Sequence, residues 1–343
     1  MKICNRCVLP ETFPGISFDE KGICNICNHY DSDSSKYDNK TKNDFKDEDE
    51  LIECLKHHKN KMNHYDVLVS LSGGVDSSFA LITIVEKFKL RPLVFHNDFS
   101  YSDETAVNNV KKLCKSLDVD YIIWRNDYSF MRKVWKYANE AQIVGMSGCY
   151  FCGNIIHLNA LEMADKFNIR IIINGLSKGQ TWTINDVDRT REVMSQTMRF
   201  ISKDTDFLTK YLKKSDMLAK QKFYLKKDDL INQVDFNKIL IIPFYIFSFY
   251  KTDKQLLKKE CQARFGWEDP VTTYPARTMN CEMSWINSYC DIKKMGYSTY
   301  HEEYSQLIRE NEMTRSQAVE DLCMNPPTGL LEQLAEEIDL RID

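Results

Sequence analysis

The eight residues LSGGVDSS at positions 71–78 constrain the fold most, because they join two segments of different periodicity. The apolar run YDVLVS before them is typical of a buried strand, and SSFALITIVEKF, which overlaps their end, has helical spacing. Glycines at a strand-to-helix junction let several backbone amides point at one spot, and the helix dipole favours an anion there. The stretch therefore predicts a phosphate-binding turn.

The rest of the chain predicts the architecture around this turn. Strand and helix patterns alternate as far as IRIIING, and KILIIPFYIFSF adds one more strand that ends at Pro243. This order is typical of an α/β domain with a doubly wound parallel sheet, and the sequence beyond Thr252 is expected to be helical. The predicted segments are an N-terminal zinc ribbon, a linker, the nucleotide-binding domain and a helical C-terminal region, at residues 1–30, 31–48, 49–250 and 251–343.

Six of the twelve cysteines form three C-x-x-C pairs. In a reducing compartment such pairs indicate metal or redox sites more than disulfides. Two pairs lie in the first 30 residues, about 16 residues apart, which suits a four-cysteine zinc site. A segment this short builds no core of its own, so Zn²⁺ would supply its folding energy and play a structural role; catalytic and redox roles are the alternatives. The ligands would be Cys4, Cys7, Cys24 and Cys27.

Within the turn, Gly73 and Gly74 allow close approach of a ligand to the backbone, and three hydroxyl groups add donors. Asp76 would repel an anion unless a cation lies between them, and Mg²⁺ is suited to that place. The lysine of G-x-x-x-x-G-K-[ST] is missing, and the turn is no G-x-G-x-x-G motif. The predicted phosphate-binding residues are Ser72, Gly73, Gly74, Val75, Asp76, Ser77 and Ser78.

The pattern S-G-G-x-D-S resembles the PP-loop of N-type ATP pyrophosphatases, which cleave ATP between the α- and β-phosphates and adenylate a carbonyl oxygen. This resemblance implies ATP and Mg²⁺ as cofactors and Asp76 as a catalytic residue. It further implies that two strand ends hold the nucleotide, through His96 and Asn97 and through Asn174 and Gly175. Lys178 is expected to neutralise charge on the α-phosphate, or else to be a solvated loop residue.

The third pair, Cys149 and Cys152 in GCYFCGN, precedes the helix that leads into IRIIING. Two ligands do not complete a metal site, and Cys281 is the best third candidate, with Cys290 behind it. Three cysteines with an open fourth position suit a 4Fe–4S cluster. A second Zn²⁺ and free thiols under a loop are the alternatives. The other cysteines are expected in the core, at positions 54, 114, 261 and 323.

The opening MKICNRCVLPETFPGISFDEKGICNICNHY, the PP-loop and GCYFCGN together resemble the bacterial N-acetyl sugar amidotransferases of surface-polysaccharide biosynthesis. The resemblance covers the first 180 residues and returns at MTRSQA, but it is weaker over residues 186–300. It implies that ATP adenylates the acetamido oxygen of a nucleotide-linked sugar and that ammonia displaces AMP to give an acetamidino group. The sequence holds no glutaminase segment, so a glutaminase partner is expected to supply the ammonia.

Two other functions remain open. A sulfur-inserting enzyme, similar to the PP-loop thiouridine and thiocytidine synthetases, would use a cluster at Cys149, Cys152 and Cys281. A noncatalytic adaptor would only bind the nucleotide. The net charge of −4 gives no general attraction to nucleic acid. No apolar run is long enough to span a bilayer and no signal core opens the chain, so a cytoplasmic location without membrane insertion is expected.

Overall fold

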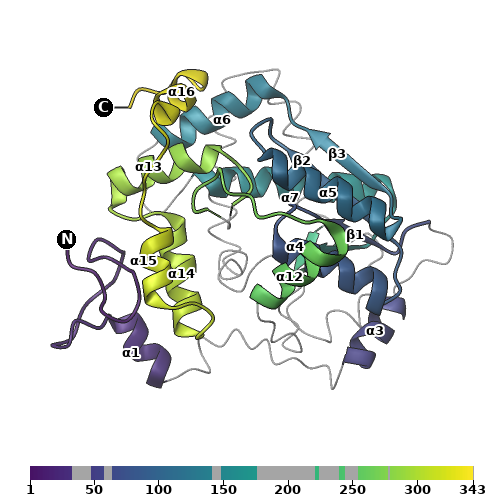
Figure 1. Ribbon diagram of the computed structural model, residues 1–343, viewed down its shortest axis with the longest axis horizontal. Helices are drawn as coiled ribbons and strands as arrows, with labels where there is room; N and C mark the ends of the chain where they lie inside the picture. Colours follow the sequence, from purple (N-terminus) through teal and green to yellow (C-terminus); the bar gives the residue numbers. More distant parts are fainter. Residues whose placement is uncertain are drawn as a thin grey trace.

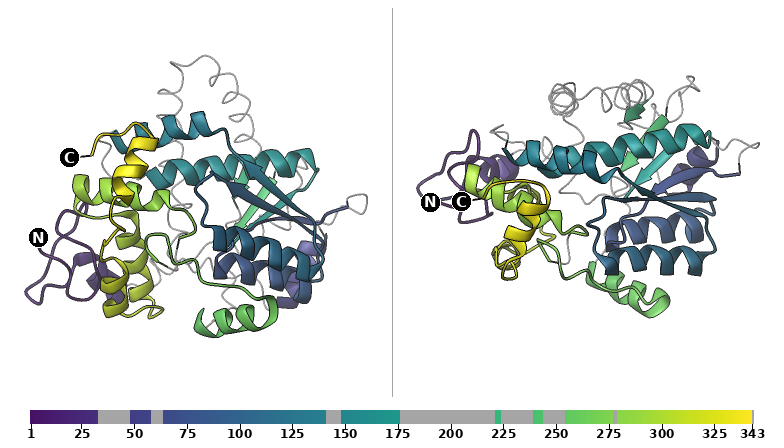
Figure 2. Two further views of the ribbon diagram at one scale, coloured as in Figure 1. Left: turned by 45° about the horizontal axis from the view of Figure 1, so that its top comes forward. Right: turned by 90° about the horizontal axis from the view of Figure 1, so that it is seen from above.

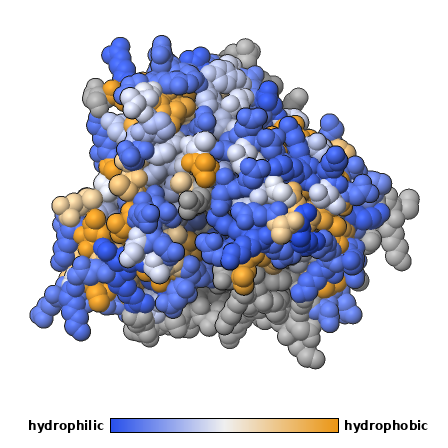
Figure 3. Space-filling model, in the orientation of Figure 1, coloured by the Kyte–Doolittle hydropathy of each residue, from blue (hydrophilic) through white to orange (hydrophobic). Residues whose placement is uncertain are grey.

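The structure, a computed structural model, describes residues 1–32, 48–57, 64–140, 148–175, 221–223, 239–243, 254–276 and 279–342. In these ranges an N-terminal ribbon, an α/β domain and a group of C-terminal helices follow one another along the chain (Figure 1). Every helix within them is too short or too polar to span a bilayer. The face drawn in Figure 3 is largely hydrophilic, and its apolar residues form small separate groups.

The α/β domain has one parallel sheet with the strand order β3-β2-β1-β4-β6-β5. From β1 the chain moves outward to β2 and β3 on one side and then returns to β4 on the other, which is the doubly wound arrangement that the sequence predicts. The sequence missed β5, because three residues are too few to form a pattern. The strands are β1 (Val67–Ser70), β2 (Pro92–Asp98), β3 (Tyr121–Arg125), β4 (Ile171–Asn174), β5 (Gln221–Phe223) and β6 (Ile239–Pro243).

Helices cover both faces of the sheet (Figure 2). Alternate residues of β1 face opposite ways: Val67 and Val69 pack in the core beneath α4 and α5, and Leu68 packs in the core beneath α6 and α7. Burial on both faces explains why the strands read as continuous apolar runs. The helices of this domain are α3 (Glu48–His57), α4 (Val75–Ile82) with the π-helical turn η1 (Thr83–Lys87), α5 (Glu104–Leu117), α6 (Tyr128–Glu140) and α7 (Gly148–Lys166).

Some expectations about local structure are wrong. GCYFCGN does not precede a helix; it forms the first turns of α7, because cysteines three positions apart are compatible with helical geometry. Residues 266–276 and 279–282 are not helical, since Pro270 and Pro275 interrupt the pattern. Cys323 is exposed, whereas Cys114 and Cys261 are buried as expected.

The ribbon, which ends in α1 (Asn25–Ser32), packs against the C-terminal helices. Val8 N donates to Ser305 Oγ at 3.2 Å, and Arg315 Nε donates to the carbonyls of Cys4 and Cys7 at 3.3 and 3.0 Å. Arg315 belongs to the MTRSQA motif, so this motif ties the first cysteine pair to the far end of the chain. The C-terminal helices are α12 (Lys254–Phe265), α13 (Met283–Met295), α14 (Thr299–Arg309), α15 (Arg315–Asp321) and α16 (Leu330–Glu337).

The start of α14 predicts a dependence of stability on pH. His301 Nδ1 accepts a hydrogen bond from Ser298 N at 3.1 Å, and burial lowers the pKa of His301 to about 4. Because the unfolded ring titrates near 6.5, the unfolded chain binds more protons between these two values. Stability is therefore complete above pH 6.5 and falls as the pH drops towards 4, by about 2 kcal/mol at pH 5.

Denaturant unfolding at pH 7 and pH 5 measures this loss. His301→Gln keeps an acceptor for Ser298 N but does not titrate, so about 2 kcal/mol of the pH dependence should disappear in this variant. Equal pH dependence in the variant and the parent chain would contradict the assignment.

Candidate active site

The turn at residues 71–78 lies between β1 and α4, at the place where the strand order reverses. Gly73 has φ +89°, and a Cβ there would lie 2.2 Å from the carbonyl oxygen of Ala106. Only glycine fits this position, because its conformation is left-handed and α5 lies directly against it. The backbone bends at Gly73 and enters α4 through Gly74, the N-cap residue.

The first turn of α4 presents its amides at this bend. The hydrogen bond from Ser78 N to Gly74 O, 3.0 Å long, opens the helical series, so the three preceding amides have no acceptor within the helix. The hydroxyls of Ser72 and Ser77 lie 3.0 Å apart, and the Ser77 hydroxyl donates to Gly74 O. These two side chains fix the turn, whereas Ser78 is fully buried and its hydroxyl does not reach the surface.

Residues that sequence reasoning missed hold the turn from outside. Asn109 Nδ2 and Trp267 Nε1 both donate to the carbonyl of Gly73, at 3.1 and 2.9 Å. Asn280 Nδ2 donates to Ser72 Oγ at 3.0 Å. No local motif marks these three residues, because their role comes from contacts with a turn that is distant in the sequence. The segment after α12, which carries Trp267 and Asn280, thus lies along one side of the site.

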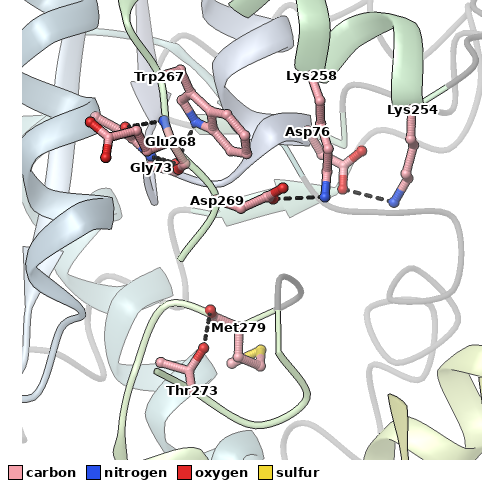
Figure 4. Close-up of polar contacts among 10 residues, drawn as sticks. Gly73, Asp76, Lys254, Lys258, Trp267, Glu268, Asp269, Thr273 and Met279 are labelled. Carbon is pink, nitrogen blue, oxygen red and sulfur yellow. Dashed lines mark hydrogen bonds and ion pairs between the residues drawn. The ribbon is translucent and has the colours of Figure 1, made fainter. Parts of the chain in front are cut away.

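Two lysines of α12 reach the same edge (Figure 4). Lys254 Nζ lies 3.0 Å from Asp76 Oδ2, and Lys258 Nζ lies 2.7 Å from Asp269 Oδ1. Partial desolvation alone would lower the pKa of Lys254, but the Asp76 carboxylate raises it above the ordinary value. Lys254 therefore stays cationic beside the amides of α4.

The ends of β2 and β4 complete this edge of the sheet. His96 is buried, its Nδ1 donates to the carbonyl of Leu71 at 2.8 Å, and burial lowers its pKa. Asn97 Oδ1 accepts from Asn159. Gly175, the residue after β4, packs directly against α4. A Cβ on it would lie 2.3 Å from Ser77 Cα. The structure thus brings the turn and both strand ends together, and His96 joins β2 to the first residue of the turn.

Asn174 is the last residue of β4 and lies beside Ser70 of β1 in the sheet. Lys178, the other predicted catalytic residue, lies outside the described residues, as do the aromatic residues of QTWTINDVDR.

The Cys149, Cys152 and Cys281 thiols interact electrostatically with one another and are called the thiol cluster below; unlike the ribbon cysteines, they are not a set of ligand atoms within 4.8 Å of one another. Burial raises the pKa of Cys152, and the nearby Cys149 and Cys281 raise it further. Burial raises the pKa of Cys281 to about 12. Trp135 Nε1 donates to Cys152 Sγ at 2.7 Å, and Cys149 Sγ lies 3.6 Å from Tyr300 Oη. The thiols of Cys152 and Cys281 are therefore neutral at physiological pH. Cys281 directly follows Asn280, which bonds to the turn, so the Cys281 end of this thiol cluster borders the candidate active site.

The ribbon cysteines form a tighter group. Within the described part of the chain, they are the one set of three or more Cys, His, Asp or Glu ligand atoms within 4.8 Å of one another. Cys7 Sγ and Cys24 Sγ are 3.8 Å apart, which matches the separation of about 3.8 Å that tetrahedral Zn–S bonds of about 2.3 Å require. The amides of Cys7 and Cys24 donate to Cys4 Sγ, which stabilises a thiolate.

The crowding of these four sulfurs affects their ionisation. Hydrogen bonds with Cys24 and Cys27 lower the pKa of Cys7 to about 6. Interactions with Cys24, Cys4 and Cys7 raise the pKa of Cys27 far above its ordinary value. All four thiolates therefore form together only beside a cation, and the donor set fits a metal ion.

The family comparison agrees with this geometry. Residues 65–227 match the family described as tRNA methyl transferase HUP domain. This part of the chain therefore has a HUP-like fold. The match and the parallel sheet agree with the α/β fold predicted from the sequence. The match does not test the resemblance to the N-acetyl sugar amidotransferases.

Other similarities are more distant. The chain is 29% identical over 173 residues to the uncharacterized protein MJ1599 of Methanocaldococcus jannaschii, covering 50% of this chain and 58% of that protein. It spans less than two thirds of that relative. The U34-tRNA thiolase NcsA of Methanococcus maripaludis with its 4Fe–4S cluster aligns with 100% of this chain and 99% of its own, at 14% identity and a TM-score of 0.35.

The NH3-dependent NAD synthetase of Campylobacter jejuni aligns with 85% of this chain and 91% of its own, at 14% identity and a TM-score of 0.36. At these TM-scores neither likeness carries an argument about function.

Proposed function

We propose that the HUP-like domain binds ATP at residues 71–78 and uses it to adenylate a carbonyl oxygen, with release of diphosphate. One observation carries this proposal: the bend at Gly73 aims the first amides of α4 at the switch point between β1 and β4. Open parallel sheets bind ligands at such a point, and a helix N-terminus favours phosphate. Lys254 adds positive charge at the same edge.

The residues of the turn have distinct roles in this reaction. The amides at positions 75–77 would hold the departing diphosphate. Asp76 is a partly exposed carboxylate at the helix start, and it fits Mg²⁺, which takes one or two protein carboxylates together with phosphate oxygens. Mg²⁺ would neutralise charge on the phosphates. Ser72 and Ser77 keep the turn rigid, so the amides need no rearrangement as charge develops.

We propose the acetamido group of a nucleotide-linked N-acetyl sugar as the oxygen that is adenylated. The support is the resemblance of the ribbon, the PP-loop and GCYFCGN to sugar amidotransferases. The acetamido oxygen would attack the α-phosphorus, and ammonia from a glutaminase partner would displace AMP to leave an acetamidino group. A structural Zn²⁺ in the ribbon would support the helices next to the site.

A second candidate is sulfur insertion, into a sugar or a tRNA. It is favoured by the thiol cluster of Cys149, Cys152 and Cys281 beside Asn280, which bonds to the turn. Three cysteines would leave one iron of a 4Fe–4S cluster open for sulfide. Anaerobically purified protein with iron, acid-labile sulfide and absorbance at about 400 nm would support this candidate, and colourless protein that contains only zinc would exclude it.

The products of ATP cleavage test the proposal. The chain is incubated with ATP, Mg²⁺, ammonium and nucleotide-linked N-acetyl sugars whose acetamido oxygen is ¹⁸O. We expect AMP and diphosphate, with ¹⁸O in the AMP, because the attacking oxygen stays on the α-phosphorus. If the AMP carried ¹⁸O only in reactions that also form a thiolated product, sulfur insertion would be favoured. Release of ADP, or AMP without the label, would contradict adenylation of the sugar.

A further inference from the structure

α12 is fixed against the turn. Its residues Leu257 and Cys261 are buried in the same core as α4 and β1. At its end, Trp267 donates to the carbonyl of Gly73, and Glu268 N donates to Asn109, which bonds to the same carbonyl. The helix that carries Lys254 is therefore joined to the phosphate-binding turn at both its middle and its end.

Lys254 and Lys258 are one helical turn apart and lie on the same face of α12. Their carboxylate partners differ in position. Asp76 belongs to the turn itself, whereas Asp269 belongs to the segment that follows α12. The Lys258 and Asp269 side chains are 15% and 23% exposed, and those of Lys254 and Asp76 are 41% and 35% exposed. Figure 4 shows both ion pairs; the Lys258–Asp269 pair joins α12 to the segment that follows it, and the more exposed Lys254–Asp76 pair joins α12 to the turn.

We propose that Lys254 binds the phosphates of ATP and that it reaches them by exchange: Mg²⁺ takes over the Asp76 carboxylate, and Lys254 leaves it for the triphosphate. This inference rests on the proposed function. Asp76 then always has a cation beside it, and Lys254 always has an anion. An ion pair this exposed is weak enough to exchange partners, because water screens the attraction between the two charges.

The carboxylates around Lys254 keep it ready for this role. Asp76, Glu303 and Glu312 all favour its charged form, so Lys254 carries a full positive charge at neutral pH when it meets the phosphates. A lysine suits this place because its ammonium is a compact charge on a flexible stem, which can turn from a carboxylate to a phosphate without moving α12.

Binding of α,β-methylene-ATP, measured by calorimetry, tests the exchange. We expect Lys254→Met to weaken binding at least 10-fold with Mg²⁺ present, and less than 3-fold with EDTA, because Lys254 still faces Asp76 without Mg²⁺. Binding of adenosine, which has no phosphate, should change less than 2-fold. Lys254→Arg keeps the charge and should recover part of the loss.

Lys136→Met is the matched control, because it also removes a lysine from an ion pair, with Asp339, but on α6. It should bind the analogue as the parent chain does. Circular dichroism and thermal melting check that each variant folds. Unchanged analogue binding in Lys254→Met, or an equal loss with Mg²⁺ and with EDTA, would overturn the exchange alone. A parent chain that binds no analogue would overturn the proposed function and this inference with it.

Discussion

Asp76→Asn is expected to lower the rate of ATP cleavage at least 100-fold and to leave the fold intact. The change removes the negative charge that would hold Mg²⁺ against the phosphates, and preorganised charges of this kind contribute about 10²–10³ in rate. Stability should change by less than about 1 kcal/mol, because the Asp76 side chain is 35% exposed and its partner Lys254 is 41% exposed. The rate of AMP release and the melting temperature measure the two effects.

Asp120→Asn is the control for this variant. Asp120 immediately precedes β3, at the amino end of the strand, and accepts a hydrogen bond from Tyr65, so it lies away from the turn. Its loss should leave the rate unchanged. If Asp76→Asn cleaved ATP at the parental rate, the turn would not be the catalytic site. If Asp76→Asn lost cleavage but kept the chain's biological activity, the chain would act as a nucleotide-binding adaptor.

Cys24→Ser is expected to remove the ribbon metal and to unfold the ribbon. Binding of Zn²⁺ to small four-ligand units contributes about 10–16 kcal/mol, which exceeds what so short a segment gains from its own core. Cys24 Sγ lies 3.8 Å from Cys7 Sγ and also accepts a hydrogen bond from Cys27 N. One lost ligand therefore disturbs both pairs. Metal analysis should show loss of about one equivalent of zinc per chain, together with a lower melting temperature.

The effect should extend beyond the ribbon. The carbonyls of Cys4 and Cys7 accept from Arg315, so the start of α15 loses its contact when the first cysteine pair moves. Cys323→Ser is the control, because Cys323 is exposed and belongs to no C-x-x-C pair. It should leave metal content and melting unchanged. A Cys24→Ser protein with the parental zinc content and melting temperature would show that the ribbon is not a zinc site.

Features that depend on neighbouring residues could be predicted from the sequence. The bend at Gly73 follows from a local requirement for glycine, and the two ribbon pairs follow from ligand spacing. The buried strands β1, β2 and β4 are visible as apolar runs because both faces of the sheet are covered. The resulting parallel order explains why the turn and Gly175 meet.

Features that depend on distant contacts could not be predicted. Trp267 and Asn109 acquire their roles only because folding places both at the carbonyl of Gly73. Lys254 lies in a charged helix that resembles any solvated helix in the sequence, and its meeting with Asp76 depends on how α12 packs against α4. Sequence reasoning therefore found the turn and missed the residues that surround it.

A crystal structure of the chain with Mg²⁺ and α,β-methylene-ATP tests the central claim most directly. The account predicts that the β- and γ-phosphates lie about 2.7–3.2 Å from the amides at positions 75–77, with Mg²⁺ on the Asp76 carboxylate. An analogue whose phosphates lie elsewhere on the chain, with the turn making no contact to them, would contradict it.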